Sequence, residues 1–228
     1  MAWPDGRDQE RPRGPRRSVT VTGTGAASGV PDVVVAELGA EAVAPDVQAA
    51  LDAATAGLTA LRASLSAAGV DAADVRTSQT STWTERPAPG GAPAGLRSAA
   101  APEPASRTTA RTTLRVVLRD VDGAGTVVRD ALAAAGPVAR LESLTTALSD
   151  VAPLAEQARE AAFADARARA EQYARLAGKG LGDVLDVREE GGAGVPAPGA
   201  FKAAAALAVE PGQQEVRASV TVRWSLGD

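Results

Sequence analysis

The chain has 228 residues, of which 45% are hydrophobic and 23% are charged, a composition typical of an ordinary globular protein. Its formal net charge of -4 offers no broad basic surface to neutralise phosphates, which argues against a nucleic-acid partner. The sequence contains neither cysteine nor histidine. Disulfides, thiolate and imidazole metal ligands, a cysteine nucleophile and a Ser-His-Asp triad are therefore excluded.

No window of the sequence approaches the roughly 20 apolar residues that span a bilayer, so we predict a soluble protein without an integral membrane segment. The beginning of the chain lacks the apolar core of a secretory signal. As written, the sequence predicts a cytoplasmic protein, and export is the alternative. Residues 1–17 contain three prolines and show no apolar periodicity, so we predict a disordered tail there.

Two strands and a helix are predicted after this tail. Val19 and Val21 alternate with threonines, and a second alternating run extends from Val34 to Ala42. We expect these two strands to be joined by a turn over Gly23 to Asp32. Apolar residues then recur at steps of three and four from Val47 to Ala68, which is typical of an amphipathic helix.

The ends of this helix have matching signals in the sequence. Pro45 suits its first position, and Gly69 suits a left-handed cap after its last turn. A polar strand is predicted from Val75 to Trp83, with its odd-numbered residues on one face. Residues 84–106 are rich in proline and glycine and predict a long flexible loop inside the domain.

The chain continues with a strand over Leu114 to Leu118 and a short helix that ends at Gly136. Asp120 or Asp122 is expected to cap this helix. The next predicted strand runs from Leu141 to Leu148.

The longest helix is predicted to begin at Ser149 or Asp150 and to end near Ala177. One apolar stripe should follow it, consisting of Leu154, Ala158, Ala162, Ala166, Ala170, Tyr173 and Ala177. A short strand over Val184 to Arg188, a second Gly/Pro-rich loop over 189–213 and a strand over Val216 to Trp224 complete the chain.

The predicted order of elements is β-β-α-β-β-α-β-α-β-β, with three main helices. Because strands and helices do not alternate regularly, the order favours an α+β fold with a mixed or antiparallel sheet. We predict one domain over residues 18–226, which includes the flexible loops 84–106 and 189–213.

Four stretches of the sequence resemble the SIMPL-domain family. They are the opening SVTVTGTG with the following Val30-Pro31-Asp32, the segment LRASLSAAGVDAADVRTSQTS from Leu61, the segment from Leu148 through AREAAFADARARAEQYARLAGKGLGDVLDV, and the final strand Val216 to Trp224. This family includes periplasmic immunogens and oxidative-stress-defence proteins. The resemblance implies assembly into homo-oligomers or association with other proteins, and it implies no catalytic residue.

Four short motifs are candidates for chemical sites. Gly23, Gly25 and Gly29 are similar to a dinucleotide-binding loop, but a strand and not a helix is expected after them, so a glycine-assisted turn is favoured. The pairs Asp120/Asp122 and Asp71/Asp74 could act in acid-base or metal chemistry, but caps and turns explain them more simply. Glu189 and Glu190 are interpreted as a solvated strand end. We therefore predict no catalytic, cofactor-binding or metal-binding residues and no cofactor.

Phe201 and Leu207 lie in an apolar stretch of the second loop. An apolar stretch in an otherwise polar loop can dock on a second subunit, a partner or a membrane, or it can fold back on its own core, and the sequence leaves both open.

The leading hypothesis is a non-catalytic homo-oligomeric scaffold linked to a stress response. The alternative is an adaptor that binds another protein through its two long loops. An enzyme that works without histidine and cysteine is the least favoured reading, because only carboxylates, lysine and tyrosine remain as reactive groups.

Overall fold

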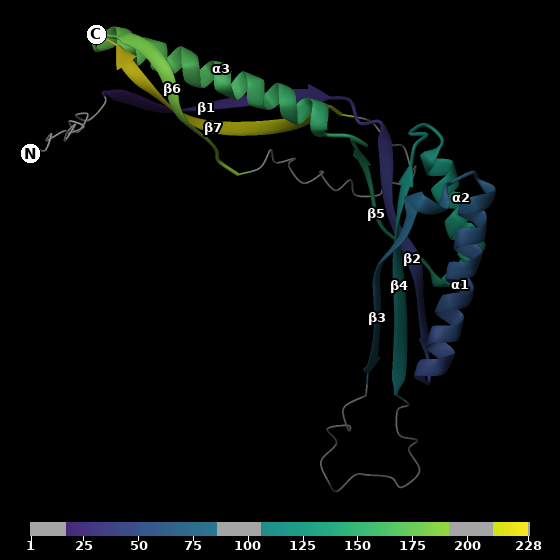
Figure 1. Cartoon of the computed structure of the whole chain (residues 1–228). Coiled ribbons are helices and arrows are strands. Elements are labelled where there is room, and N and C mark those ends of the chain that lie inside the picture. The colour runs from purple at the N-terminus through teal and green to yellow at the C-terminus, as the bar shows by residue number, and fades with distance from the viewer. Residues whose placement is uncertain (1–16, 86–105, 192–211, 228) are drawn as a thin grey trace, which may run out of the picture. The chain divides into compact units, whose positions relative to one another are not determined.

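The computed structural model describes residues 17–85, 106–191 and 212–227. Over these residues it contains three α-helices and seven strands in the predicted order, so the predicted α+β fold is confirmed. The strands form two sheets instead of the one expected, and the chain divides into two compact units (Figure 1). The tail before Arg17 and most of the two predicted loops lie outside the described residues.

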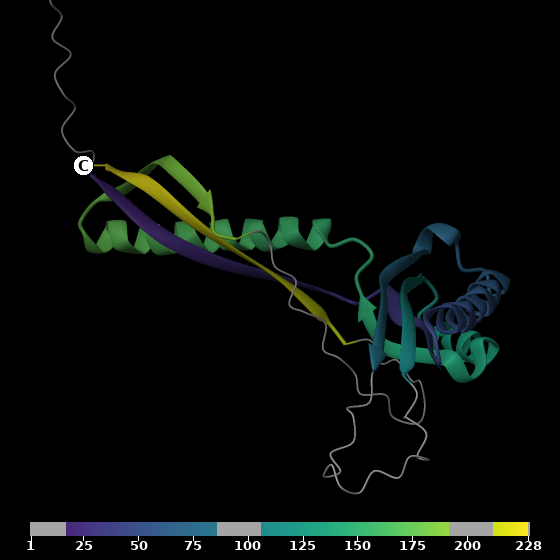
Figure 2. The same ribbon diagram turned by 90° about the horizontal axis from the view of Figure 1, so that it is seen from below.

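The first unit, called the α3 unit, consists of residues 17–29, 150–191 and 215–227. Its sheet has the strand order β1-β7-β6. The strands are β1 (Ser18–Gly29), β6 (Gly180–Glu189) and β7 (Gln214–Gly227). Helix α3 (Ala152–Leu176) runs along one face of this sheet (Figure 2).

The contact between α3 and the sheet is made of small side chains. The helix buries Ala155, Ala158, Ala162, Ala166, Ala170 and Ala174. The alternating residues of β7 from Val216 to Trp224 are buried as predicted, and the ring of Trp224 lies 6.1 Å from that of Phe163. Gly23 and Gly25 of β1 lie so close to α3 that an added Cβ would sit 2.2 Å from a helix carbonyl oxygen at either position. These glycines therefore allow direct contact of the strand backbone with the helix backbone.

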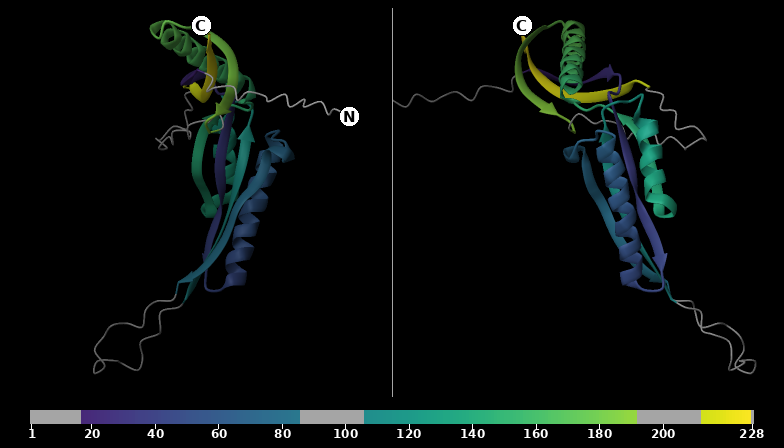
Figure 3. Two further views of the ribbon diagram at one scale, coloured as in Figure 1. Left: turned by 60° about the vertical axis from the view of Figure 1, so that its left-hand side comes forward. Right: turned by 90° about the vertical axis from the view of Figure 1, so that its right-hand side faces the viewer.

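The second unit, called the α1–α2 unit, consists of residues 30–85, 106–149 and 212–214. Its antiparallel sheet has the order β3-β4-β2-β5. The strands are β2 (Val33–Ala44), β3 (Val75–Glu85), β4 (Arg107–Leu118) and β5 (Ala139–Ala147). Helices α1 (Val47–Ala67) and α2 (Ala124–Ala135) pack on one face of this sheet, where leucines and valines form the core (Figure 3).

The predicted turn between the first two strands is wrong. β1 continues through Gly23 and Gly25 to Gly29, and β1 and β2 belong to different sheets. The glycines that suggested a turn are required by the close contact with α3.

Helix α1 has the predicted end but a different beginning. Asp46 is its N-cap and accepts a hydrogen bond from the amide of Ala49 at 2.9 Å, so Pro45 precedes the helix. Gly69 adopts φ +83°, and the amide of Val70 donates to the carbonyl of Leu65, which completes a left-handed cap.

The capping predictions for the other two helices are wrong in detail. Gly123 is the N-cap of α2, and the Asp120 carboxylate accepts from the amide of Gly123 instead of a residue inside the helix. α3 begins after Val151, and the Asp150 carboxylate accepts from the amide of Ala152 at 2.8 Å. Tyr173 was expected in the apolar stripe of α3 but is 55% exposed, because the stripe turns toward Ala174.

Strand β3 contains a bulge that the sequence analysis missed. Its pairing with β4 passes from Thr77 opposite Leu114 to Gln79 opposite Thr113, so Ser78 is an additional residue. Odd-numbered residues before and after the bulge therefore lie on opposite faces of the sheet. Strand β6 is also longer than predicted, because it begins at Gly180 and not at Val184.

We expect Gly23→Ala to lower the free energy of unfolding by about 1–3 kcal/mol, the usual cost of overpacking. An added Cβ would lie 2.2 Å from the carbonyl oxygen of Ala162 and 2.4 Å from the amide nitrogen of Ala166. Equilibrium unfolding in urea measures the loss. Gly180→Ala is the control, since nothing lies within 4 Å of its added Cβ, and equal losses in the two variants would contradict the close contact.

Candidate functional site

The two residues predicted to contact a subunit or partner, Phe201 and Leu207, lie outside the described residues. The two described units contain the remaining candidates for a functional site. Three kinds of feature have chemical or binding potential: the carboxylates, the face of the larger sheet that carries no helix, and the edges of both sheets.

The paired carboxylates that were weighed as chemical groups all lie in structural contacts or turns. Asp71 accepts from the amide of Ala73 at 2.8 Å, as its predicted turn role requires. Asp74 is held by two hydrogen bonds from Arg119, at 2.9 and 2.8 Å. Residues 17–85, 106–191 and 212–227 contain no group of three acidic side chains that could hold a metal ion.

The glutamates at the end of β6 are likewise engaged. Glu189 accepts from Nε of Arg159 at 3.3 Å, and Glu190 accepts from the hydroxyl of Thr221 at 2.7 Å. The glycines of β1 are followed by the strand β2, so the helix N-terminus that a dinucleotide site requires is missing at this place.

The face of the β3-β4-β2-β5 sheet that carries no helix is lined with charged side chains. Arg111 pairs with Glu142 and lies 3.7 Å from Glu41, which also pairs with Arg140 at 3.4 Å. Arg115 lies 3.7 Å from Glu37 on the neighbouring strand. Cross-strand pairs of opposite charge stabilise a sheet modestly, so these ion pairs help to hold β4, β2 and β5 together on this face.

A hollow of about 360 Å³ lies at one end of this face. Three arginines line it, namely Arg76, Arg115 and Arg119. Arg76 of β3 lies directly opposite Arg115 of β4, which places two like charges side by side. Like charges opposite one another destabilise a sheet, so a carboxylate close to both arginines would be stabilising.

A carboxylate–hydroxyl contact joins the beginning of β2 to the end of β5 beside this hollow. Asp32 accepts from the amide of Ser149 at 2.6 Å and from its hydroxyl at 2.5 Å. These hydrogen bonds lower the pKa of Asp32 below its ordinary value, and the positive charge of Arg119 adds to the shift. The two hydrogen bonds from Arg119 to Asp74 raise the pKa of Arg119 in turn.

The free edge of β1 is covered by α3. The amide of Leu226 donates to the carbonyl of Arg17, so the odd-numbered residues of β1 form hydrogen bonds with β7. In an antiparallel pair the intervening, even-numbered residues then direct their backbone N–H and C=O groups away from β7. On that side, the amide of Thr24 donates to Asp165 at 2.9 Å, and Arg169 donates to the carbonyl of Thr22 at 2.9 Å. Asp165 and Arg169 form an ion pair with each other at 2.8 Å. This pair occupies the place of a neighbouring strand and closes the middle of the edge.

The edges of β5 and β6 are protected by charge and by irregular pairing. β6 carries Asp183, Asp186, Arg188 and Glu189, and its register with β7 shifts on both sides of Val184. β5 carries Arg140 and Glu142, and its register with β2 shifts at Glu37. Charges and bulges at an edge discourage pairing with another strand.

The edge of β3 also has a register shift, at Ser78, but its charges lie only near its ends. Its only charged residues are Arg76 near one end and Glu85 at the other, and the eight residues between them are uncharged. All of β3 is exposed except Val75 and Ser81, which are half-buried, and Trp83 is 41% exposed. Of the four sheet edges in the described residues, β3 therefore offers the longest accessible run for pairing with a further strand.

The sequence predicts this strand but not its place at the edge of the sheet. The signal for the edge is an uncharged, Thr/Ser-rich run bounded by one basic and one acidic residue. The strand order, which places β3 at the edge, cannot be read from the alternation of side chains.

Comparison with known proteins gives one family. The family model SIMPL, described as a protein of unknown function (DUF541), matches residues 19–224. No curated protein matches the chain. No described helix is long and apolar enough to cross a membrane.

The contact between Asp32 and Ser149 predicts a pH-dependent stability. Because the folded pKa of Asp32 is lowered, the contact stabilises the fold above the ordinary aspartate pKa of about 4, and the gain disappears as the pH falls through the lower folded pKa. We expect Ser149→Ala to lower the melting temperature more near pH 6 than near pH 2. Thermal unfolding over this range, with the exposed Ser66→Ala as control, measures the difference. A loss that is the same at every pH would contradict this role.

Proposed function

The chain belongs to the SIMPL family, and on this premise we propose that it is a non-catalytic protein that works by assembling with further copies of itself. The observation that carries the proposal is the accessible, uncharged edge of β3. An unprotected edge presents a row of backbone donors and acceptors that another strand can pair with.

The absence of catalysis is supported by the chemistry of the side chains. The sequence has no cysteine or histidine, which removes a thiolate nucleophile and the side chain that titrates near neutrality. Three of the carboxylates that were considered as acid-base groups, Asp71, Asp74 and Asp120, accept hydrogen bonds from nearby backbone amides or from Arg119.

Assembly is also supported by the composition of the α3 unit. Alanine and glycine fill the contact between α3 and β1, so this part of the interior offers little apolar side-chain surface to bury. Further burial between copies would add to its stability. We place the assembly in a stress response on the family resemblance alone, and the adaptor alternative involves loops of which the structure describes only the ends.

We expect light scattering of the purified protein at micromolar concentration to give a mass of at least twice the 22.9 kDa of one chain. The reason is that paired strand edges gain backbone hydrogen bonds and buried surface together. A mass of one chain that persists as the concentration is raised would overturn the proposal.

A further inference from the structure

We propose that two copies of the chain pair antiparallel along β3, about a twofold axis at Ser81, so that their four-stranded sheets join into one continuous sheet. The inference rests on the proposed function, since it names the surface through which the copies assemble. A twofold axis makes such a contact close on itself, with each copy contributing the same residues.

The central part of β3 is suited to pairing with itself. With Ser81 opposite Ser81 of the second copy, Thr80 lies opposite Thr82, and Gln79 lies opposite Trp83. Gln79, Ser81 and Trp83 all lie on the helix-free face, because they oppose Thr113, Arg111 and Thr109 of β4. Thr80 and Thr82 share the other face. Each pair therefore brings together side chains of the same face, as directly opposite residues in one sheet require.

The bulge at Ser78 keeps this match as the pairing continues outward. Since Ser78 is an additional residue in each copy, the next pairs are Thr77 opposite Thr84 and Arg76 opposite Glu85. Thr77 lies on the helix face, where Arg62 of α1 donates to its hydroxyl at 3.1 Å, and Thr84 lies opposite Thr108 on the same face. If Ser78 were paired with Thr84 instead of being left out, Thr77 would lie opposite Glu85, which is on the other face of the sheet.

The ends of the paired strands carry complementary charges. Arg76 and Glu85 have no ion pair within the described residues, although each is exposed. In the proposed register each Arg76 meets a Glu85 of the other copy, so the contact contains two opposite-charge pairs related by the axis. The Glu85 carboxylate of the second copy would also lie close to Arg115, which is directly opposite Arg76. A negative charge at this place would reduce the repulsion between the two arginines.

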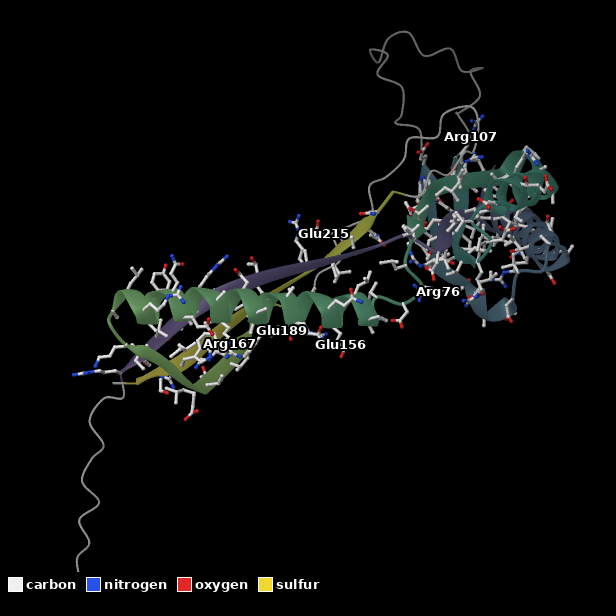
Figure 4. All side chains as sticks on the ribbon, turned by 90° about the horizontal axis from the view of Figure 1, so that it is seen from above. Arg76, Arg107, Glu156, Arg167, Glu189 and Glu215 are labelled. Atoms are coloured by element: carbon white, nitrogen blue, oxygen red, sulfur yellow. The ribbon has the colours of Figure 1, made fainter. Side chains whose placement is uncertain are left out.

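Figure 4 shows the end positions on the α1–α2 unit. Arg76 and Arg107 are labelled there, and Arg107 is the β4 residue opposite Glu85. The two labelled residues lie at opposite ends of the β3–β4 pair, so the two charge pairs would lie at the two ends of the interface.

Single cysteines test the register, because the natural chain contains none. Ser81→Cys should form a covalent dimer on mild oxidation or with a short thiol cross-linker, since directly opposite Cβ atoms lie about 4.5–5.5 Å apart. Thr77→Cys and Thr84→Cys should each remain uncrosslinked, because each is on the order of 20 Å from its own copy at a rise of about 3.3 Å per residue. A mixture of these two variants should crosslink. Ser66→Cys on the exposed surface of α1 is the control for random collision.

Charge reversal tests the ends. Arg76→Glu and Glu85→Arg should each weaken association on the order of ten-fold, since each places like charges opposite one another at both ends. The double variant should regain the wild-type affinity, because it restores both pairs with their signs exchanged. Sedimentation over a concentration series measures the affinities, and circular dichroism checks the fold.

The outcomes separate this inference from the proposed function. Covalent dimers of Ser81→Cys, crosslinking only in the Thr77→Cys/Thr84→Cys mixture and rescue by the double charge reversal would support the β3 contact. A wild-type oligomer in which Ser81→Cys crosslinks no better than Ser66→Cys would overturn the β3 contact and leave self-assembly intact. A wild-type monomer would overturn both.

Discussion

A sheet edge leaves one row of backbone N–H and C=O groups without a strand partner, and this constraint governs both units of the molecule. Each sheet has two edges, and they are treated in different ways. The edge of β1 is closed by Asp165 and Arg169, and those of β5 and β6 by charges and irregular register. β3 also has a bulge, but it keeps an accessible run of eight uncharged residues between Arg76 and Glu85, which is why we assign assembly to it.

Small side chains determine how the edge of β1 is closed. Because α3 presents alanines and β1 presents Gly23 and Gly25, the helix backbone approaches the strand directly. At that separation the short side chain of Asp165 reaches the amide of Thr24, while Arg169 reaches the carbonyl of Thr22. Larger residues at the glycines would move the helix outward and remove these hydrogen bonds from the strand.

The sequence predicted the elements more fully than their arrangement. The alternation over Val216 to Trp224 and the three-four spacing after Val47 reflect local geometry, so the strand and the helix were found where the structure has them. The division into two sheets depends on which strands pair, and the glycines of β1 suggested a turn because their contact with α3 is remote in sequence. The bulge at Ser78 leaves no mark in the composition of β3, so the faces of its residues could not be assigned. The place of β3 at the edge depends on the strand order, which local alternation does not reveal.

That bulge has a consequence for selectivity among related proteins. β4 alternates uniformly and still pairs with both halves of β3, because Ser78 is left out of the ladder, so any partner strand must leave out the same residue. The place of the inserted residue thus determines which residues of a partner meet Arg76 and Glu85. A related protein whose charged residues lie one position nearer or farther along the strand would not form these charge pairs, without any difference in the overall fold.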